Sequence, residues 1–264
     1  MRVHRGDGGV IRIGHRGAAA LAAENTLRGL EAAVAAGVDV VEFDVRDLAD
    51  GPLVLAHSSD LRELSGGRAE GTIRDRTLDE LREVVPELPT LDEALELLAS
   101  ADVGVHVDLK VATRVREVPD ALRRHGLEAR AVVSSAHRPS LDVIRAAAPG
   151  LTIGLSYPED RYGVSRHRAL QPVLRIGTLA LRASVARRVP AMVARGRPAV
   201  LMLHHAVVSP AALRRAHALG VAVWAWTVDH PLELERVTSA GVDGVITNDP
   251  AIFPVPQAVA TLST

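Results

Sequence analysis

Glu42 and Asp44 stand one residue apart near the end of an apolar run at 38–45. The run is rich in β-branched residues and predicts a strand, so both carboxylates point to the same face. Paired carboxylates repel each other and lose hydration unless a positive charge lies between them. Divalent ions such as Mg²⁺ and Ca²⁺ favour oxygen ligands and would supply that charge. Alternatively, one acid simply lies at the solvated strand end, and this strand alone leaves both interpretations open.

Other polar side chains that could take part in catalysis or binding also follow predicted strands. They are two histidines, an arginine, a lysine and a third acid. In chain order they are His15 and Arg16 after the first strand, His57 after a segment that returns from the Asp50-Gly51 turn, and Asp108 and Lys110 at the end of a strand from Val103.

Together these residue types suit phosphate ester cleavage. Three acids can bind a divalent ion, and Arg16 and Lys110 offer positive donors to phosphate oxygens. Two histidines can serve as general base and general acid. No Walker-type loop is present, which argues against nucleotide-driven phosphoryl transfer. Each residue also has a plain alternative, because His15 could be an exposed loop residue and Asp108 could pair with Lys110.

Four further residues on the predicted strands have other possible roles. His204 could line the site or be structural, and Trp226 could form a wall of the ligand site. Trp224 is expected to be buried packing. His106 shares a strand face with Asp108 but lies deeper, so we expect a hydrogen-bonded core residue rather than a ligand.

The elements that carry these residues alternate regularly. Eight main strands begin at Val10, Val38, Val103, Arg130, Leu151, Ala199, Val221 and Asp243. Predicted helices cover 27–36, two short segments capped by Thr77 and Thr90, 115–125, 139–147, 167–195, 210–219, 231–239 and 250–261. Pro172 and Pro190 could divide the region 167–195 into two helices.

Eight alternating units predict an α/β fold of the (β/α)8 TIM-barrel class, in one domain spanning 1–264. A small insertion at about 58–100 follows the second strand. A doubly wound open sheet is the main rival, but no glycine-rich dinucleotide fingerprint follows the first strand. Active residues of such barrels gather at the carboxyl ends of the strands, so the polar residues above should meet at one mouth.

Composition excludes several classes of protein. The net charge of −1, from 31 basic and 32 acidic residues, gives no general attraction to nucleic acid or anionic membranes. The absence of cysteine rules out disulfides and thiolate chemistry. No apolar signal core or bilayer-length run is present, so we expect a cytoplasmic protein without stable membrane insertion. The oligomeric state is left open.

An ordered set of motifs resembles the glycerophosphodiester phosphodiesterase family and covers nearly the whole chain. The motifs are Ile13-Gly14-His15-Arg16-Gly17, Glu24-Asn25-Thr26, Glu42-Phe43-Asp44, Leu53-Val54-Leu55-Ala56-His57, Asp108-Leu109-Lys110, Val133-Ser134-Ser135, Trp226-Thr227-Val228-Asp229 and the stretch 241–250.

The resemblance implies a barrel that hydrolyses glycerophosphodiesters to sn-glycerol 3-phosphate and an alcohol. It implies that His15 and His57 act as acid and base in an order left open, and that Arg16 and Lys110 contact phosphate. It further implies that Trp226 lies near the glycerol moiety. Glu24 is also implied to lie near the site, and the set implied to hold Mg²⁺ or Ca²⁺ is Glu42, Asp44 and Asp108.

The chain departs from the family pattern in a few places. Asp108 replaces a usual Glu, Asp229 replaces a usual Asn, and Asn248 replaces a usual Asp. The segment after His57 is only partly similar. Alternative functions are a lysophospholipase D-like activity on lysophospholipids and a catalytically silent protein that binds glycerophosphodiesters or phosphate. A barrel enzyme that abstracts a proton beside a carboxylate is disfavoured by the two histidines.

Overall fold

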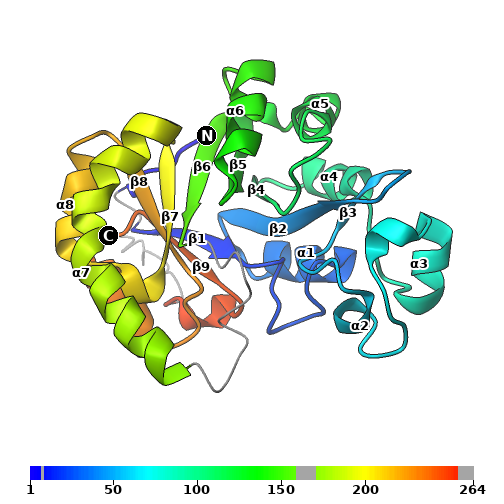
Figure 1. Cartoon of the computed structure of the whole chain (residues 1–264), viewed down its shortest axis with the longest axis horizontal. Coiled ribbons are helices and arrows are strands. Elements are labelled where there is room, and N and C mark those ends of the chain that lie inside the picture. Colours follow the sequence, from blue (N-terminus) through cyan, green and yellow to red (C-terminus); the bar gives the residue numbers. More distant parts are fainter. Residues whose placement is uncertain (7–8, 159–170, 255–264) are drawn as a thin grey trace, which may run out of the picture.

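The computed structural model describes residues 1–6, 9–158 and 171–254. Within them, eight parallel strands form a closed barrel, because β1 pairs with both β2 and β9 (Figure 1). The barrel strands are β1 (Ile11–Gly14), β2 (Val40–Asp47), β4 (Gly104–Leu109), β5 (Ala131–Ser135), β6 (Thr152–Tyr157), β7 (Val200–His204), β8 (Ala222–Trp226) and β9 (Gly244–Thr247). The predicted (β/α)8 TIM-barrel class is confirmed.

Helices connect the barrel strands along the outside. They are α1 (Leu27–Ala35), α4 (Leu91–Ala99), α5 (Glu117–Arg124), α6 (Arg138–Ala147), α7 (Gln171–Gly196), α8 (Pro210–His217) and α9 (Pro231–Ala240), with 3₁₀ turns η2 (Glu128–Arg130), η5 (His205–Val207) and η6 (Pro250–Ile252). The helix starts follow local chemistry: Thr26 Oγ1 accepts the Gly29 N–H at 3.0 Å and so caps α1.

The excursion after β2 begins with a hairpin. Strand β3 (Leu53–Leu55) runs antiparallel to β2, and α2 (Leu61–Leu64), η1 (Ile73–Asp75) and α3 (Leu78–Val84) follow it. These elements lie on the side of the barrel away from α7 and α8 (Figure 1). They enclose a small apolar cluster of their own, whose fully buried members include Leu48, Ile73 and Leu81. Within 58–100, α4 contacts α1 and α5 and is therefore the barrel helix that precedes β4.

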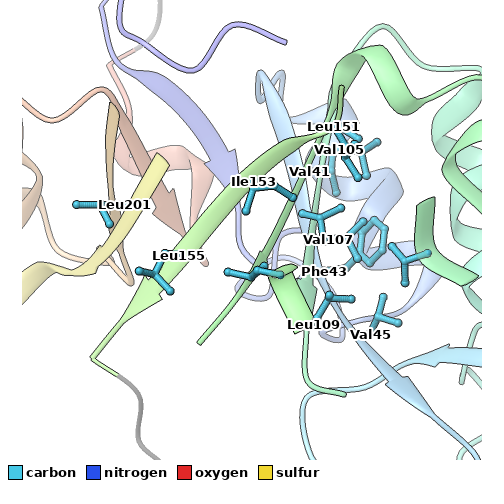
Figure 2. Close-up of a cluster of buried hydrophobic side chains, with 14 of the residues drawn as sticks. Val41, Phe43, Val45, Val105, Val107, Leu109, Leu151, Ile153, Leu155 and Leu201 are labelled. Carbon is cyan, nitrogen blue, oxygen red and sulfur yellow. The ribbon is translucent and has the colours of Figure 1, made fainter. Parts of the chain in front are cut away.

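Residues on the strands alternate between two environments. Val41, Phe43 and Val45 on β2 belong to the large cluster packed beneath the outer helices, together with side chains of β4 and β6 (Figure 2). Residues of the opposite phase, such as Val40, Val132 and Trp224, form a second cluster that fills the barrel interior. Glu42 and Asp44 share the phase of Val40, so β2 directs both acids to the barrel axis.

Two helix predictions need correction or lie outside the described residues. Pro190 does not divide the long region, because α7 is continuous from Gln171 to Gly196. The hydrogen bond that proline cannot donate is offset by burial of Val185, Val189 and Met192 on either side. The predicted final helix at 250–261 is only the turn η6 in the described part, and residues 255–264 and 159–170 lie outside it. No described helix combines the length and apolarity that crossing a membrane requires.

Candidate active site

The turn after β1 positions His15 and Arg16. Gly17 has a φ of +85°, and a Cβ added there would lie 2.4 Å from the Gly29 backbone of α1. Only glycine permits this close approach of the turn to the helix. Arg16 itself has a φ of +52°, an uncommon conformation for an arginine that is held by its N–H donating to Glu42 Oε2 at 2.7 Å.

The three predicted metal ligands meet at the mouth. Asp44 and Asp108 are direct neighbours in the register of β2 and β4, and Glu42 lies one step deeper on the same face. One carboxylate oxygen from each of the three lies within 4.8 Å of the others. Glu42 and Asp44 are buried, while Asp108 is partly exposed. Strand alternation and barrel closure thus deliver three carboxylates to one point.

Two cations lie against these carboxylates. Lys110 Nζ contacts Asp44 Oδ1 at 3.1 Å and Asp108 Oδ2 at 2.5 Å. Arg16 Nε contacts Asp44 Oδ2 at 3.1 Å. The alternative that Asp108 pairs with Lys110 is therefore correct, but the pair is part of the site and does not exclude a site role for either residue.

The charges give the two buried acids opposite tendencies. Burial, followed by the neighbouring Asp44 and Asp108, raises the pKa of Glu42 well above its usual range. Burial also acts to raise the pKa of Asp44. That pKa is nevertheless held well below its usual range by the charge of Lys110, by the hydrogen bond with His57 and by the charge of Arg16. The site thus contains one carboxyl that gains most from an added positive charge, namely Glu42.

Hydrogen bonds define the state of His15. Its Nδ1 lies 2.7 Å from Asn248 Oδ1, while Asn248 Nδ2 donates to Asp229 Oδ2 at 2.7 Å. The amide oxygen of Asn248 therefore faces His15, so Nδ1 carries the imidazole proton and Nε2 keeps its lone pair. Burial, with the nearby Arg16 guanidinium, lowers the pKa of His15 to about 4. His15 is consequently neutral near neutral pH.

His57 reaches the mouth from the hairpin rather than from a barrel strand. Its Nδ1 lies 2.9 Å from an Arg16 Nη2 and 3.2 Å from Asp44 Oδ2. A guanidinium can only donate and a carboxylate can only accept, so Nδ1 serves one of them at a time. When Nδ1 accepts from Arg16, the imidazole proton lies on Nε2; when Nδ1 carries the proton, it donates to Asp44. Arg46 Nε also donates to the His57 carbonyl at 2.9 Å and fixes the backbone of this residue.

Three other predicted site residues lie around this centre. Glu24 Oε2 accepts from Arg16 Nη1 at 2.7 Å and so joins the site through that arginine. Trp226 ends β8, donates from Nε1 to the Met202 carbonyl at 2.9 Å and stands edge-on to the His204 ring at 5.1 Å. Among the described residues, no hydrogen bond links Trp226 or His204 to the three carboxylates.

Three residues that the sequence did not predict as site residues support the site. Asn25 is buried, donates from Nδ2 to Asp44 Oδ2 at 3.0 Å and accepts the Asp44 N–H on Oδ1 at 3.0 Å. Ser134 Oγ donates to Asp108 Oδ1 at 2.5 Å, and Asn248 contacts His15 as described. All three stand within motifs that the sequence had marked, but only their partners in space show these roles.

A cavity of about 720 Å³ opens beside His57 and Arg16, and its wall includes residues of α2 and of the segment that follows α3. Apolar and charged side chains share its wall. They include Glu24, Leu55, Glu63, Leu64, Arg68, Val85, Glu87 and Leu88. The site therefore continues into a space large enough for a small organic group.

The donor set fits a hard divalent cation. All three candidate ligands are carboxylates, and two of them are buried. Carboxylates so close together repel one another, and the ion pairs of Lys110 and Arg16 are made with Asp44 and Asp108. Oxygen-only sites of this kind suit Mg²⁺ or Ca²⁺.

Residues 15–252 match the glycerophosphoryl diester phosphodiesterase family. The chain belongs to this family. The matched segment begins at His15 and includes every residue of the site described above. Both the resemblance noted in the sequence and the prediction of a phosphoric diester hydrolase are therefore confirmed.

Individual members of the family align along almost their full length. The glycerophosphodiester phosphodiesterase of Caldanaerobacter subterraneus subsp. tengcongensis is 28% identical over 258 residues, covering 90% of this chain and 93% of that protein. A putative glycerophosphoryl diester phosphodiesterase from Silicibacter pomeroyi has a TM-score of 0.76 at 26% identity, covering 95% and 93% of the two chains. An Oleispira antarctica phosphodiesterase, solved with the product sn-glycerol-3-phosphate, has a TM-score of 0.71 at 22% identity over 90% and 93%.

Proposed function

We propose that this protein hydrolyses glycerophosphodiesters to sn-glycerol 3-phosphate and an alcohol in a reaction that depends on a divalent cation. One observation carries the proposal: Glu42, Asp44 and Asp108 each bring a carboxylate oxygen within 4.8 Å of the others. The cations Arg16 and Lys110 flank this cluster. Family membership and the product bound to the Oleispira relative support the substrate class.

The candidate ligands of the cation are Glu42, Asp44 and Asp108. When bound, the cation supplies positive charge that polarises the phosphoryl group. Arg16 and Lys110 are assigned to the phosphate oxygens, which need cationic donors. Glu24 orients Arg16 through their 2.7 Å ion pair.

The two histidines are given separate tasks. His15 is neutral with its proton on Nδ1, so Nε2 can accept a proton from the nucleophile as general base. The nucleophile is water or the glycerol 2-hydroxyl, and its oxygen forms the new bond to phosphorus. Attack by the 2-hydroxyl gives a cyclic glycerol phosphate, which water then opens to sn-glycerol 3-phosphate. His57, with its Nε2 proton when Arg16 donates to Nδ1, is assigned as the acid that protonates the departing alcohol oxygen. The bond that breaks joins phosphorus to that oxygen.

The two parts of the substrate are assigned to opposite sides of the centre. The cavity beside His57 is the proposed place for the alcohol, because it adjoins the residue that protonates the leaving oxygen. Trp226 is proposed to contact the glycerol moiety, with the His204 ring supporting it. Trp226 is held in turn by its bond to the Met202 carbonyl.

A turnover assay with glycerophosphocholine tests the function. The protein should release choline and sn-glycerol 3-phosphate, lose activity in EDTA and regain it with Mg²⁺ or Ca²⁺. Glu42→Gln should lower the activity at saturating cation, because it removes one charged ligand. Release of phosphocholine, or undiminished turnover after exhaustive chelation, would contradict the proposal.

Two additional arms of this assay address the open alternatives. Lysophosphatidylcholine offered under the same conditions measures lysophospholipase D-like activity, which would need the cavity to accept an acyl-bearing substrate. Binding of glycerophosphocholine with no turnover at any cation concentration would indicate a silent binding protein. Detection of a cyclic glycerol phosphate would identify the 2-hydroxyl as the nucleophile.

A further inference from the structure

A row of polar side chains continues from the site into the barrel interior. Lys110 Nζ contacts Asp108 Oδ2 at 2.5 Å, and Ser134 Oγ donates to Asp108 Oδ1 at 2.5 Å. Below them, His106 Nε2 lies 2.8 Å from Ser134 Oγ. Both Ser134 and His106 are buried, at 0% and 2% exposure. Each oxygen of Asp108 is therefore engaged by a different group.

Strand register explains the row. Asp108 on β4 pairs directly with Ser134 on β5, and His106 stands two residues before Asp108 on the same strand face. The His106 ring also packs edge-on against Trp224 at 5.7 Å within the interior cluster. This packing fixes the ring that faces Ser134.

The protons in this row can be counted. The Ser134 hydroxyl has one proton, which it gives to Asp108, so it must accept from His106. His106 therefore carries its proton on Nε2. Its Nδ1 is buried and has no hydrogen-bond partner among the described residues. A buried nitrogen without a partner is unfavourable, so the arrangement that leaves it so should serve a purpose at the other end of the row.

We propose that Ser134, oriented by His106, is a positioning residue that fixes the Asp108 carboxylate for the divalent cation. The hydroxyl holds Oδ1, which leaves Oδ2 with Lys110, whose Nζ also contacts Asp44 Oδ1. A short aspartate side chain on a strand needs such support, because rotation about its terminal bond would otherwise move the ligand oxygen. This inference rests on the cation site of the proposed function.

The neighbouring serine provides a matched control. Ser135 lies on the same strand and is 1% exposed, but its Oγ donates to the Leu109 carbonyl at 3.0 Å and accepts the His137 N–H at 3.1 Å. It therefore resembles Ser134 in residue type, strand and burial, and differs in that its hydrogen bonds within the described residues do not include Asp108. Loss of either hydroxyl should affect stability similarly.

Calorimetric titration of the full-length protein with Mg²⁺ and with Ca²⁺, without substrate, tests the inference. Ser134→Ala should weaken cation binding by about tenfold to a hundredfold, the range seen when partners of metal ligands are removed. Ser135→Ala should bind the cation as the unaltered protein does. His106→Leu should weaken binding, while His106→Gln, whose amide can donate to Ser134, should restore much of it. Thermal unfolding of each variant checks that it is folded.

The outcomes separate this inference from the proposed function. Weakened binding in Ser134→Ala alone among the serine variants supports the positioning role. Unchanged binding in Ser134→Ala, or equal weakening in both serine variants, overturns it while leaving the cation site intact. An unaltered protein that binds neither cation, measured beside Glu42→Gln, overturns the cation site itself.

Discussion

Asn248 donates from Nδ2 to Asp229 Oδ2 at 2.7 Å, so two positions at which the sequence departs from the family pattern contact each other. By the pattern that the sequence resemblance implied, the two departures are opposite: an amide stands in place of an acid at 248, and an acid stands in place of an amide at 229. One amide and one carboxylate are thus kept with their places exchanged. The result is that the neutral member of the pair faces His15.

Asn248→Asp should therefore raise the pKa of His15. In the unaltered protein this pKa is lowered to about 4 by burial and by Arg16, so His15 stays unprotonated down to that pH. At saturating cation, which keeps Glu42 ionised despite its raised pKa, the acid limb of kcat/KM that belongs to His15 should lie at about pH 4 or below. A carboxylate at 248 would stabilise the imidazolium and shift the limb to higher pH. The pH profile of glycerophosphocholine turnover measures the shift.

Combining Asn248→Asp with Asp229→Asn supplies the control for this shift. The double variant restores an amide–carboxylate pair, so its stability should exceed that of Asn248→Asp, where two carboxylates face each other. Its acid limb should nonetheless remain raised, because the carboxylate still faces His15. A limb that returns to its original position would show that residue 248 does not set the state of His15.

The assignment of acid and base is testable with the leaving group. His57→Gln should lower kcat on glycerophosphocholine by about a hundredfold to ten-thousandfold. The loss should be much smaller for the p-nitrophenyl ester of glycerol 3-phosphate, because nitrophenolate leaves without being protonated. His15→Gln should lose activity on both substrates, since both need the nucleophile to be deprotonated. The opposite pattern would exchange the roles of the two histidines.

Asn25→Asp should disturb the buried Asp44. The change keeps the shape of the side chain and suits the φ of +55°, but it replaces the amide that donates to Asp44 Oδ2 with a carboxyl. Loss of this buried hydrogen bond should lower stability by about 1–3 kcal/mol, and cation affinity should change as well. Chemical unfolding and calorimetric titration measure the two effects. Unaltered values in both would show that Asn25 does not support Asp44.

Lys110→Met should make stability depend on the cation. Lys110 contacts both the buried Asp44 and the partly exposed Asp108, so its removal takes away a counter-charge that the two acids share and should destabilise chelated protein by roughly 3–5 kcal/mol. Added Mg²⁺ or Ca²⁺ should recover much of that loss. Thermal unfolding with and without EDTA measures both. Arg28→Met, which breaks the exposed pair with Glu87, should change stability by less than about 1 kcal/mol in either condition.

The barrel and its acid cluster could be predicted because both follow from periodic features. Apolar strands that alternate with helices indicate the barrel, and residues two apart on β2 must share a face. The register between β2 and β4 brings the third acid to the cluster, because Asp44 and Asp108 are paired neighbours. His57 was within reach for a related reason, because its hairpin is marked by the Asp50-Gly51 turn.

The supporting contacts could not be predicted, because they depend on the third dimension. Asn25 reads as part of a helix start, and nothing local shows that its amide folds back onto Asp44. The state of His15 depends on which atom of Asn248 faces it, which Asp229 decides. The continuity of α7 through Pro190 depends on burial against the barrel, which outweighs the local preference.

The alternation of β2 makes folding and site formation a single event. Val41, Phe43 and Val45 lie under the helices in the same strand that sends Glu42 and Asp44 to the axis. A register shift of β2 by one residue would turn Phe43 towards the barrel mouth and bury Glu42 and Asp44 among the apolar side chains under the helices. Such a chain would not fold. Every folded molecule therefore already has these two acids facing the barrel axis.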